Sequence, residues 1–70
     1  MIYKINIMQF YSQNKYGINV FDGNTLIKSS DDITDNEADI AKLVDMCNEL
    51  EIELCHFDDI IEDYLTDFHI

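Results

Sequence analysis

Hydrophobic and polar residues alternate over the first thirty residues of the chain, and a period of two is typical of β-strands. The strands predicted from this alternation cover residues 2–11, 16–21 and 25–29, with a turn at residues 12–14. The Asp22-Gly23 pair favours a tight hairpin between the last two strands, because glycine readily adopts the positive φ that such turns need. The pattern therefore predicts a three-stranded antiparallel meander.

The period changes to about 3.6 after residue 33, which is typical of amphipathic helices. Thr34 and Glu37 match a capping box, which predicts that Thr34 caps the first helix, of about sixteen residues. Its apolar stripe is Ile40, Leu43, Val44, Cys47 and Leu50. A second helix is predicted over residues 56–68, with the stripe Phe57, Ile60, Ile61, Tyr64, Leu65 and Phe68. Residues 51–54 either fray the first helix or form a short extended connection.

These elements predict a single domain over residues 1–70, of class α+β and order βββαα. A three-stranded antiparallel sheet is followed by two antiparallel amphipathic helices, which are expected to cover one face of the sheet. Both faces of the first two strands carry apolar residues, however, and one pair of helices covers only one face. Either the second face packs against another copy, as a homodimer through the sheet, or it is a binding patch.

Charge divides the chain into two unlike halves. Residues 1–30 hold three lysines and one aspartate, a net charge of +2, whereas residues 31–70 hold one lysine and fourteen carboxylates, a net charge of −13. Nucleic acids and anionic membranes bind proteins through lysine and arginine, so we expect neither as a direct partner. No hydrophobic stretch predicts a transmembrane helix or a secretory signal, and two cysteines without C-x-x-C spacing favour reduced thiols in the cytoplasm.

No pattern typical of catalysis is present, so the prediction is a non-enzyme without catalytic residues or a cofactor. The two glycines do not form a phosphate-binding loop. Neither cysteine has a basic neighbour that would stabilise its thiolate, and the surrounding carboxylates oppose its ionisation.

His56 and Asp59 lie three residues apart and would share a helix face. They are either half of a divalent-metal or small-ligand site, completed by Asp63 or His69, or a capping pair at the start of the helix. The capping interpretation is favoured, because zinc sites usually contain more histidine and cysteine at closer spacing. We therefore assign no metal ligands at this stage.

The acidic helices admit three interpretations: a solvated face that keeps the protein soluble, a cation-binding surface, or a surface that docks on a basic protein. In the last case carboxylates would occupy the positions of nucleic-acid phosphates, and the protein would inhibit a nucleic-acid-binding partner. The residues predicted to bind the partner are Asp58, Asp59, Glu62, Asp63 and Asp67, with Glu49, Glu51 and Glu53 secondary.

Two motifs carry a resemblance to a known family. The first is Tyr16-Gly17-Ile18-x-Val20, and the second is His56-Phe57-x-Asp59-Ile60-Ile61-Glu62-Asp63-Tyr64-Leu65. From Tyr16 onward the chain resembles an uncharacterised family of small proteins from clostridia and related Firmicutes, which implies no particular function. It departs from that family's pattern at Glu53-Leu54-Cys55, before the histidine. In size and acidity the chain is also similar to phage-encoded inhibitors of bacterial defence, including anti-CRISPR proteins.

Overall fold

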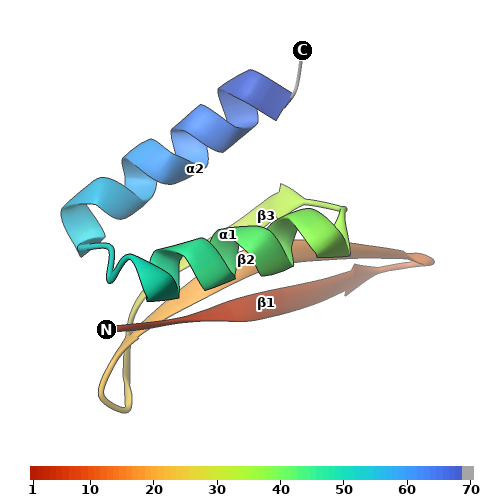
Figure 1. The fold of residues 1–70 in the computed structure, drawn as a ribbon. Coiled ribbons are helices and arrows are strands. Elements are labelled where there is room, and N and C mark those ends of the chain that lie inside the picture. The colour runs from red at the N-terminus through yellow and green to blue at the C-terminus, as the bar shows by residue number, and fades with distance from the viewer. Residues whose placement is uncertain (69–70) are drawn as a thin grey trace.

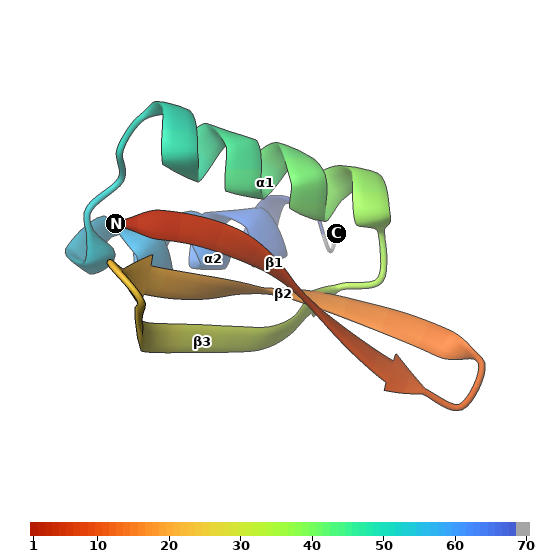
Figure 2. The same cartoon turned by 90° about the horizontal axis from the view of Figure 1, so that it is seen from below.

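The order of the elements agrees with the prediction. The computed structural model describes the backbone of residues 1–68 and the side chains of residues 1–66. The elements are β1 (Ile2–Phe10), β2 (Gln13–Asp22), β3 (Thr25–Thr34), α1 (Glu37–Glu49) and α2 (Leu54–Phe68). The sheet is antiparallel with strand order β1-β2-β3, and the two helices run in opposite directions over one of its faces (Figure 1, Figure 2). The βββαα architecture is therefore confirmed.

The strands are longer than their apolar patterns predicted. Residues 12–14 do not form the first turn, because Gln13 already pairs with Phe10 and the turn consists of Tyr11 and Ser12. Strand β3 continues five residues beyond its predicted end, through an irregularity in its pairing with β2 between Ser30 and Thr34. This extension carries Ile33 into the core, so tertiary burial outweighs the polar composition of the segment.

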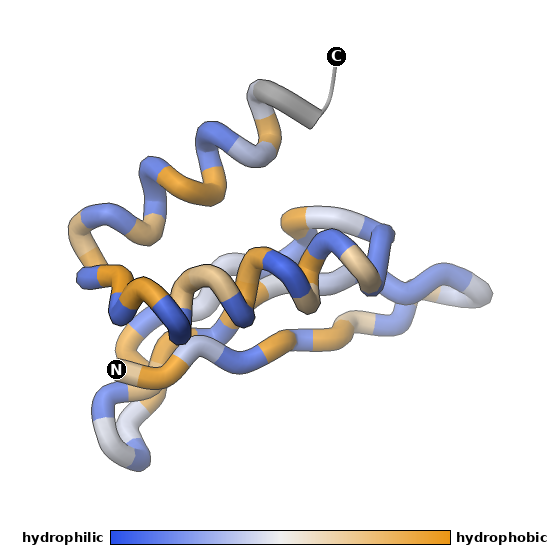
Figure 3. Tube along the Cα trace, in the orientation of Figure 1, coloured by the Kyte–Doolittle hydropathy of each residue, from blue (hydrophilic) through white to orange (hydrophobic). Residues whose placement is uncertain are grey.

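The core lies between the helices and the sheet face that they cover, here called the inner face. The buried side chains of the core, within residues 1–66, are all apolar or aromatic. They are Tyr3, Tyr16, Ile18, Val20, Ile33, Ile40, Leu43, Val44, Cys47, Phe57, Ile61 and Tyr64. Hydrophobic and polar residues alternate along both helices at the spacing that such one-sided burial requires (Figure 3). The predicted helical stripes are confirmed at these positions, but Leu50 and Leu65 are exposed, and the side chain of Phe68 lies outside the described residues.

Tyr3 connects the first strand to both helices. Its backbone N–H donates to Asn48 Oδ1 and its carbonyl accepts from Asn48 Nδ2, both at 2.9 Å, so the end of α1 is fixed against β1. The Tyr3 hydroxyl donates to the carbonyl of Ile52, and its ring lies 5.4 Å from that of Phe57. One residue therefore holds the end of α1, the connection and the start of α2.

The helix ends differ from the predicted capping box. Asn36, not Thr34, caps α1, and its side chain accepts from the backbone N–H of Asp39. The Thr34 hydroxyl instead accepts from the N–H of Asn36 and donates to the Tyr64 hydroxyl oxygen, because β3 extends through Thr34 and leaves it before the cap.

The connection between the helices begins with a Schellman motif. Ile52 N–H donates to Cys47 C=O and Glu51 N–H donates to Asn48 C=O, with Glu51 at φ 49°. This motif ends α1 at Glu49, so the helix has 13 residues where about sixteen were predicted, and α2 begins at Leu54, before the predicted His56.

The opposite sheet face, here called the outer face, is not covered by either helix (Figure 2). The register places Ile2, Phe21 and Leu26 side by side at one end of this face, and Lys4 lies over the Phe21 ring at 5.4 Å. Polar residues occupy its middle, where Asp31 accepts from Asn6 and Ser29. The apolar residues predicted on this face are therefore present, with Ile2, Phe21 and Leu26 at one end and Met8 and Phe10 toward the β1–β2 turn.

Gly17 is required by the close approach of two strands, which gives a first prediction. A Cβ at this position would lie 2.2 Å from the carbonyl oxygen of Ser30, where β3 bulges against β2. We expect Gly17→Ala to lower the free energy of unfolding by about 3 kcal/mol, the upper end of the usual cost of overpacking, measured by urea denaturation.

Gly23 provides the matched control. It has φ +63° and open space around its Cα, so only the backbone conformation limits substitution there. Asparagine tolerates this conformation, and Gly23→Asn should therefore cost less than about 1 kcal/mol. Equal losses in the two variants would contradict the close-approach explanation.

Candidate functional site

The acidic face is the exposed side of α2 formed by Asp58, Asp59, Glu62 and Asp63. All four carboxylates are exposed, whereas Phe57, Ile61 and Tyr64 on the other side of the helix are buried. The helical repeat of 3.6 residues separates the two sets. The structure thus brings four of the five primary predicted residues together; the side chain of Asp67 lies outside the described residues.

The acidic face is almost uncompensated by positive charge. Lys28 of β3 pairs with Asp58, with 2.7 Å between Nζ and Oδ1, and this is the one salt bridge among the side chains of residues 1–66. Asp59, Glu62 and Asp63 have no cationic partner in the same part of the chain. Neighbouring carboxylates without counter-ions repel one another, which favours any ligand that supplies positive charge.

The secondary residues Glu49, Glu51 and Glu53 are exposed around the connection between α1 and α2. Glu51 adopts the left-handed conformation that ends α1, so its position follows from the Schellman motif. The Glu53 carbonyl accepts from the N–H groups of His56 and Phe57 at the start of α2.

Glu53 also forms a group with Cys55 and His56 that the sequence interpretation missed. One potential metal-ligand atom from each residue lies within 4.8 Å of the other two, and all three side chains are exposed. Asp59, the predicted partner of His56, is not in this group, and His69 lies outside the described residues. His56 and Asp59 form no ion pair, and α2 already begins at Leu54, so the predicted capping pair lies inside the helix and not at its start. The signal in the sequence is Glu-x-Cys-His, with Glu53 directly before the first residue of α2.

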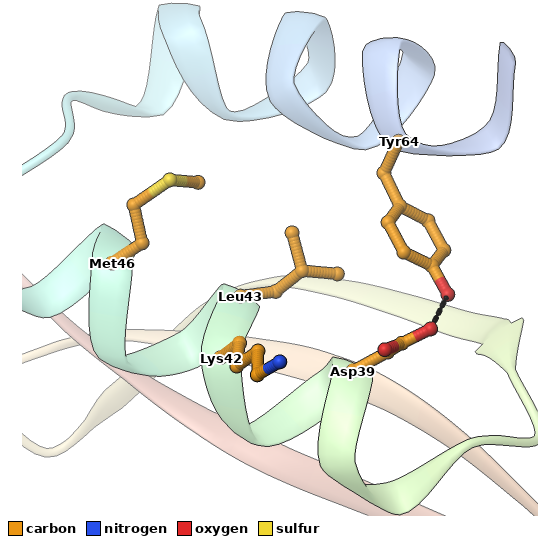
Figure 4. Close-up of a pocket in the computed structure, with 5 residues that line it drawn as sticks. All are labelled: Asp39, Lys42, Leu43, Met46 and Tyr64. Carbon is orange, nitrogen blue, oxygen red and sulfur yellow. Dashed lines mark hydrogen bonds between the residues drawn. The ribbon is translucent and has the colours of Figure 1, made fainter. Parts of the chain in front are cut away.

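A groove of about 280 Å³ lies between the two helices. Leu43 and Met46 extend from α1 toward α2, while Lys42 and Asp39 lie beside them on the same helix (Figure 4). Tyr64 closes one end by extending from α2 and donating to Asp39 Oδ2 at 2.8 Å. The walls are largely apolar, and the volume is slightly below the range of typical small-ligand pockets.

Both cysteines are free, and they differ in environment. Cys47 is buried on the inner side of α1, and burial raises the pKa of its thiol above the ordinary 9.0. Cys55 is exposed. Of the two cysteines, only Cys55 is therefore accessible to a ligand.

No helix within residues 1–68 is long and apolar enough to cross a membrane.

One comparison with known proteins gives a match. A protein-family model, described as a family of unknown function (DUF6514), matches residues 1–67. No curated protein and no solved structure matches the chain. The family model confirms the predicted resemblance to an uncharacterised family. The match begins at residue 1, whereas the predicted likeness began at Tyr16.

The buried tyrosine at the groove predicts a loss of stability in alkali. Burial, followed by interactions with Asp39, raises the pKa of Tyr64 above its ordinary 10.0. The pKa of Tyr64 is therefore higher in the folded state than in the unfolded state. The stability that its protonated hydroxyl contributes is complete below pH 10 and is lost as the pH rises through the pKa of the folded state. We expect the free energy of unfolding to fall above about pH 10, measured by urea denaturation.

Tyr64→Phe should lower the free energy of unfolding by about 1 kcal/mol at pH 7, because two hydrogen bonds are lost, and should weaken the alkaline decline. Tyr11→Phe is the matched control, since Tyr11 is fully exposed at the hairpin turn. An alkaline decline of equal steepness in wild type and Tyr64→Phe would contradict the assignment to Tyr64.

Proposed function

The chain belongs to the family of unknown function DUF6514, and we propose that it is a small binding module, without catalytic activity, whose acidic face docks on a basic protein. The single observation that carries this proposal is the cluster of exposed carboxylates on α2, of which only Asp58 is paired with a cation among residues 1–66.

The linear charge density of the acidic face is close to that of one DNA strand. Asp58 to Asp63 span six residues, or about 9 Å at the helical rise, and carry four carboxylates, of which Lys28 neutralises Asp58. This leaves about one negative charge per 3 Å, compared with about one per 3.4 Å along one DNA strand. A groove built to neutralise phosphates would therefore meet a similar field on this helix.

The partner that best fits this charge is a nucleic-acid-binding protein, which the module would inhibit by occupying the nucleic-acid groove. An inhibitor of bacterial defence of the phage-encoded kind would act in this way. The groups on the acidic face lie on a regular helix, and side chains on helices are positioned more precisely than side chains on loops.

Neutralising the acidic face provides the test. The variant combines Asp58→Asn, Asp59→Asn, Glu62→Gln and Asp63→Asn. We expect the wild-type chain, immobilised, to capture basic proteins from bacterial lysate at 50 mM salt and to release them when duplex DNA is added. The neutralised variant should bind the captured proteins at least about tenfold more weakly, since charge complementarity drives the association.

The matched control removes the same charge elsewhere, with Asp22→Asn, Asp32→Asn, Asp35→Asn and Asp45→Asn, all at exposed positions. Circular dichroism checks that both variants are folded. Equal binding by the two variants, or capture that DNA and high salt do not reverse, would show that the acidic face serves solubility alone.

A second candidate function is binding of a zinc-class divalent cation by Glu53, Cys55 and His56. Cys55 Sγ lies 3.7 Å from Glu53 Oε2, and the usual zinc–sulfur and zinc–oxygen lengths place two tetrahedral ligands about 3.5–3.7 Å apart. Thiolate and imidazole select zinc over magnesium or calcium. Three protein ligands would leave the fourth position open for water or for a group from a partner.

Cobalt(II) titration tests this site, because a cobalt–thiolate bond gives a charge-transfer band in the near ultraviolet. We expect the band in the wild type and in Asp59→Asn, and its loss in Cys55→Ser. Zinc at a hundredfold excess over its dissociation constant should add about 2.7 kcal/mol to the free energy of unfolding, reversed by chelation. An unchanged unfolding midpoint with zinc would exclude the site, and loss of binding in Asp59→Asn alone would assign it to His56 and Asp59 instead.

A further inference from the structure

Strand β1 lies at an edge of the sheet, and Asn48 shows which of its backbone groups point outward. The strand order leaves one side of β1 unpaired (Figure 1). Asn48 bonds both the N–H and the C=O of Tyr3, while β2 holds the opposite side of β1. Along an antiparallel strand, the residues whose backbone N–H and C=O groups point outward alternate with residues whose groups point inward. The N–H and C=O groups of Ile5, Ile7 and Gln9 therefore point outward, as those of Tyr3 do.

Asn48 closes this edge at Tyr3 only, and the stretch from Ile5 to Gln9 is open. The hairpin formed by β1 and β2 extends past the start of α1 (Figure 2). As a result Ile5 and Ile7, which share the inner face with Tyr3, are 40% and 59% exposed. An exposed apolar edge strand of this kind readily pairs with another strand.

The charge distribution selects a second copy of this chain as the occupant. Residues 1–21 contain no carboxylate, and their charged side chains are Lys4 and Lys15. Two chains of net charge −11 repel one another, and the repulsion is weakest where no carboxylate faces the partner. Strand β1 itself carries no carboxylate, although Asp31 bonds to Asn6 and Glu37 bonds to Tyr16 beside it, and its residues from Ile5 to Gln9 are uncharged.

We propose that two copies associate by antiparallel pairing of their β1 edges around a twofold axis at Ile7. Ile7 then pairs with Ile7 of the second copy, and Ile5 pairs with Gln9 of the second copy. About six main-chain hydrogen bonds form in this register. The two Ile7 side chains meet on the inner face, each Ile5 lies diagonal to Ile7 of the other copy, and the two sheets become one continuous sheet. This proposal is independent of the acidic face and of the metal ligands.

Sedimentation of the intact chain at about 200 μM tests the association, with an expected mass twice the 8.2 kDa of one chain. Ile7→Lys, which puts a charge at the centre of the pairing, should be monomeric. Leu26→Lys on the outer face is the matched control and should remain dimeric. A monomeric wild type, or a dimer disrupted by Leu26→Lys and not by Ile7→Lys, would overturn the proposal.

Cysteine cross-linking tests the register, in a Cys55→Ser background. A hydrogen-bonded antiparallel pair has Cα atoms about 5.5 Å apart, which suits a disulfide. Ile7→Cys should therefore oxidise to a covalent dimer. Gln9→Cys should not, because its own counterpart would lie about 14 Å away along the strand. Cross-linking of Gln9→Cys in preference to Ile7→Cys would exclude pairing about Ile7.

Discussion

The attachment of β1 to the helical layer through Tyr3 is the interaction on which the arrangement depends. Asn48 fixes the end of α1 to the Tyr3 backbone, the Ile52 carbonyl fixes the connection to its hydroxyl, and Phe57 packs on its ring. Each contact uses a different part of one residue. Tyr3 therefore sets where α2 begins, and through α2 it sets which side of that helix faces solvent.

Helix α2 shows how an acidic layer remains attached to a nearly neutral sheet. Its contacts with the core are mainly apolar, through Phe57, Ile61 and Tyr64. The Tyr64 hydroxyl adds hydrogen bonds with Thr34 and Asp39, and the Lys28–Asp58 pair adds one exposed ionic contact. Exposed ion pairs contribute little to stability, so burial is the main attraction. Because the carboxylates are absent from the buried side, they are available to a partner without any cost of opening the fold.

The sequence was sufficient to predict the order and class of the elements, because strand and helix periods differ clearly in this chain. It also predicted the buried positions of α1 and the four described carboxylates that α2 exposes. It did not predict the extension of β3, since Ile33 is the only strongly apolar residue of that polar segment. The true cap at Asn36 was missed because Thr34 satisfies the same motif two residues earlier. The group of Glu53, Cys55 and His56 depends on a turn of the backbone that composition does not show.

The irregular pairing of β3 has a consequence for the size of any assembly. The sheet has two edges, and they are unlike: β1 pairs with β2 in continuous register, whereas β3 pairs through two shifts and exposes Asp31 and Asp32. Bulges and charged residues on an edge oppose strand addition. Growth by edge pairing can therefore proceed from one side only, and a twofold contact uses that side in both copies. Such an assembly is closed at two chains and does not propagate into a fibre.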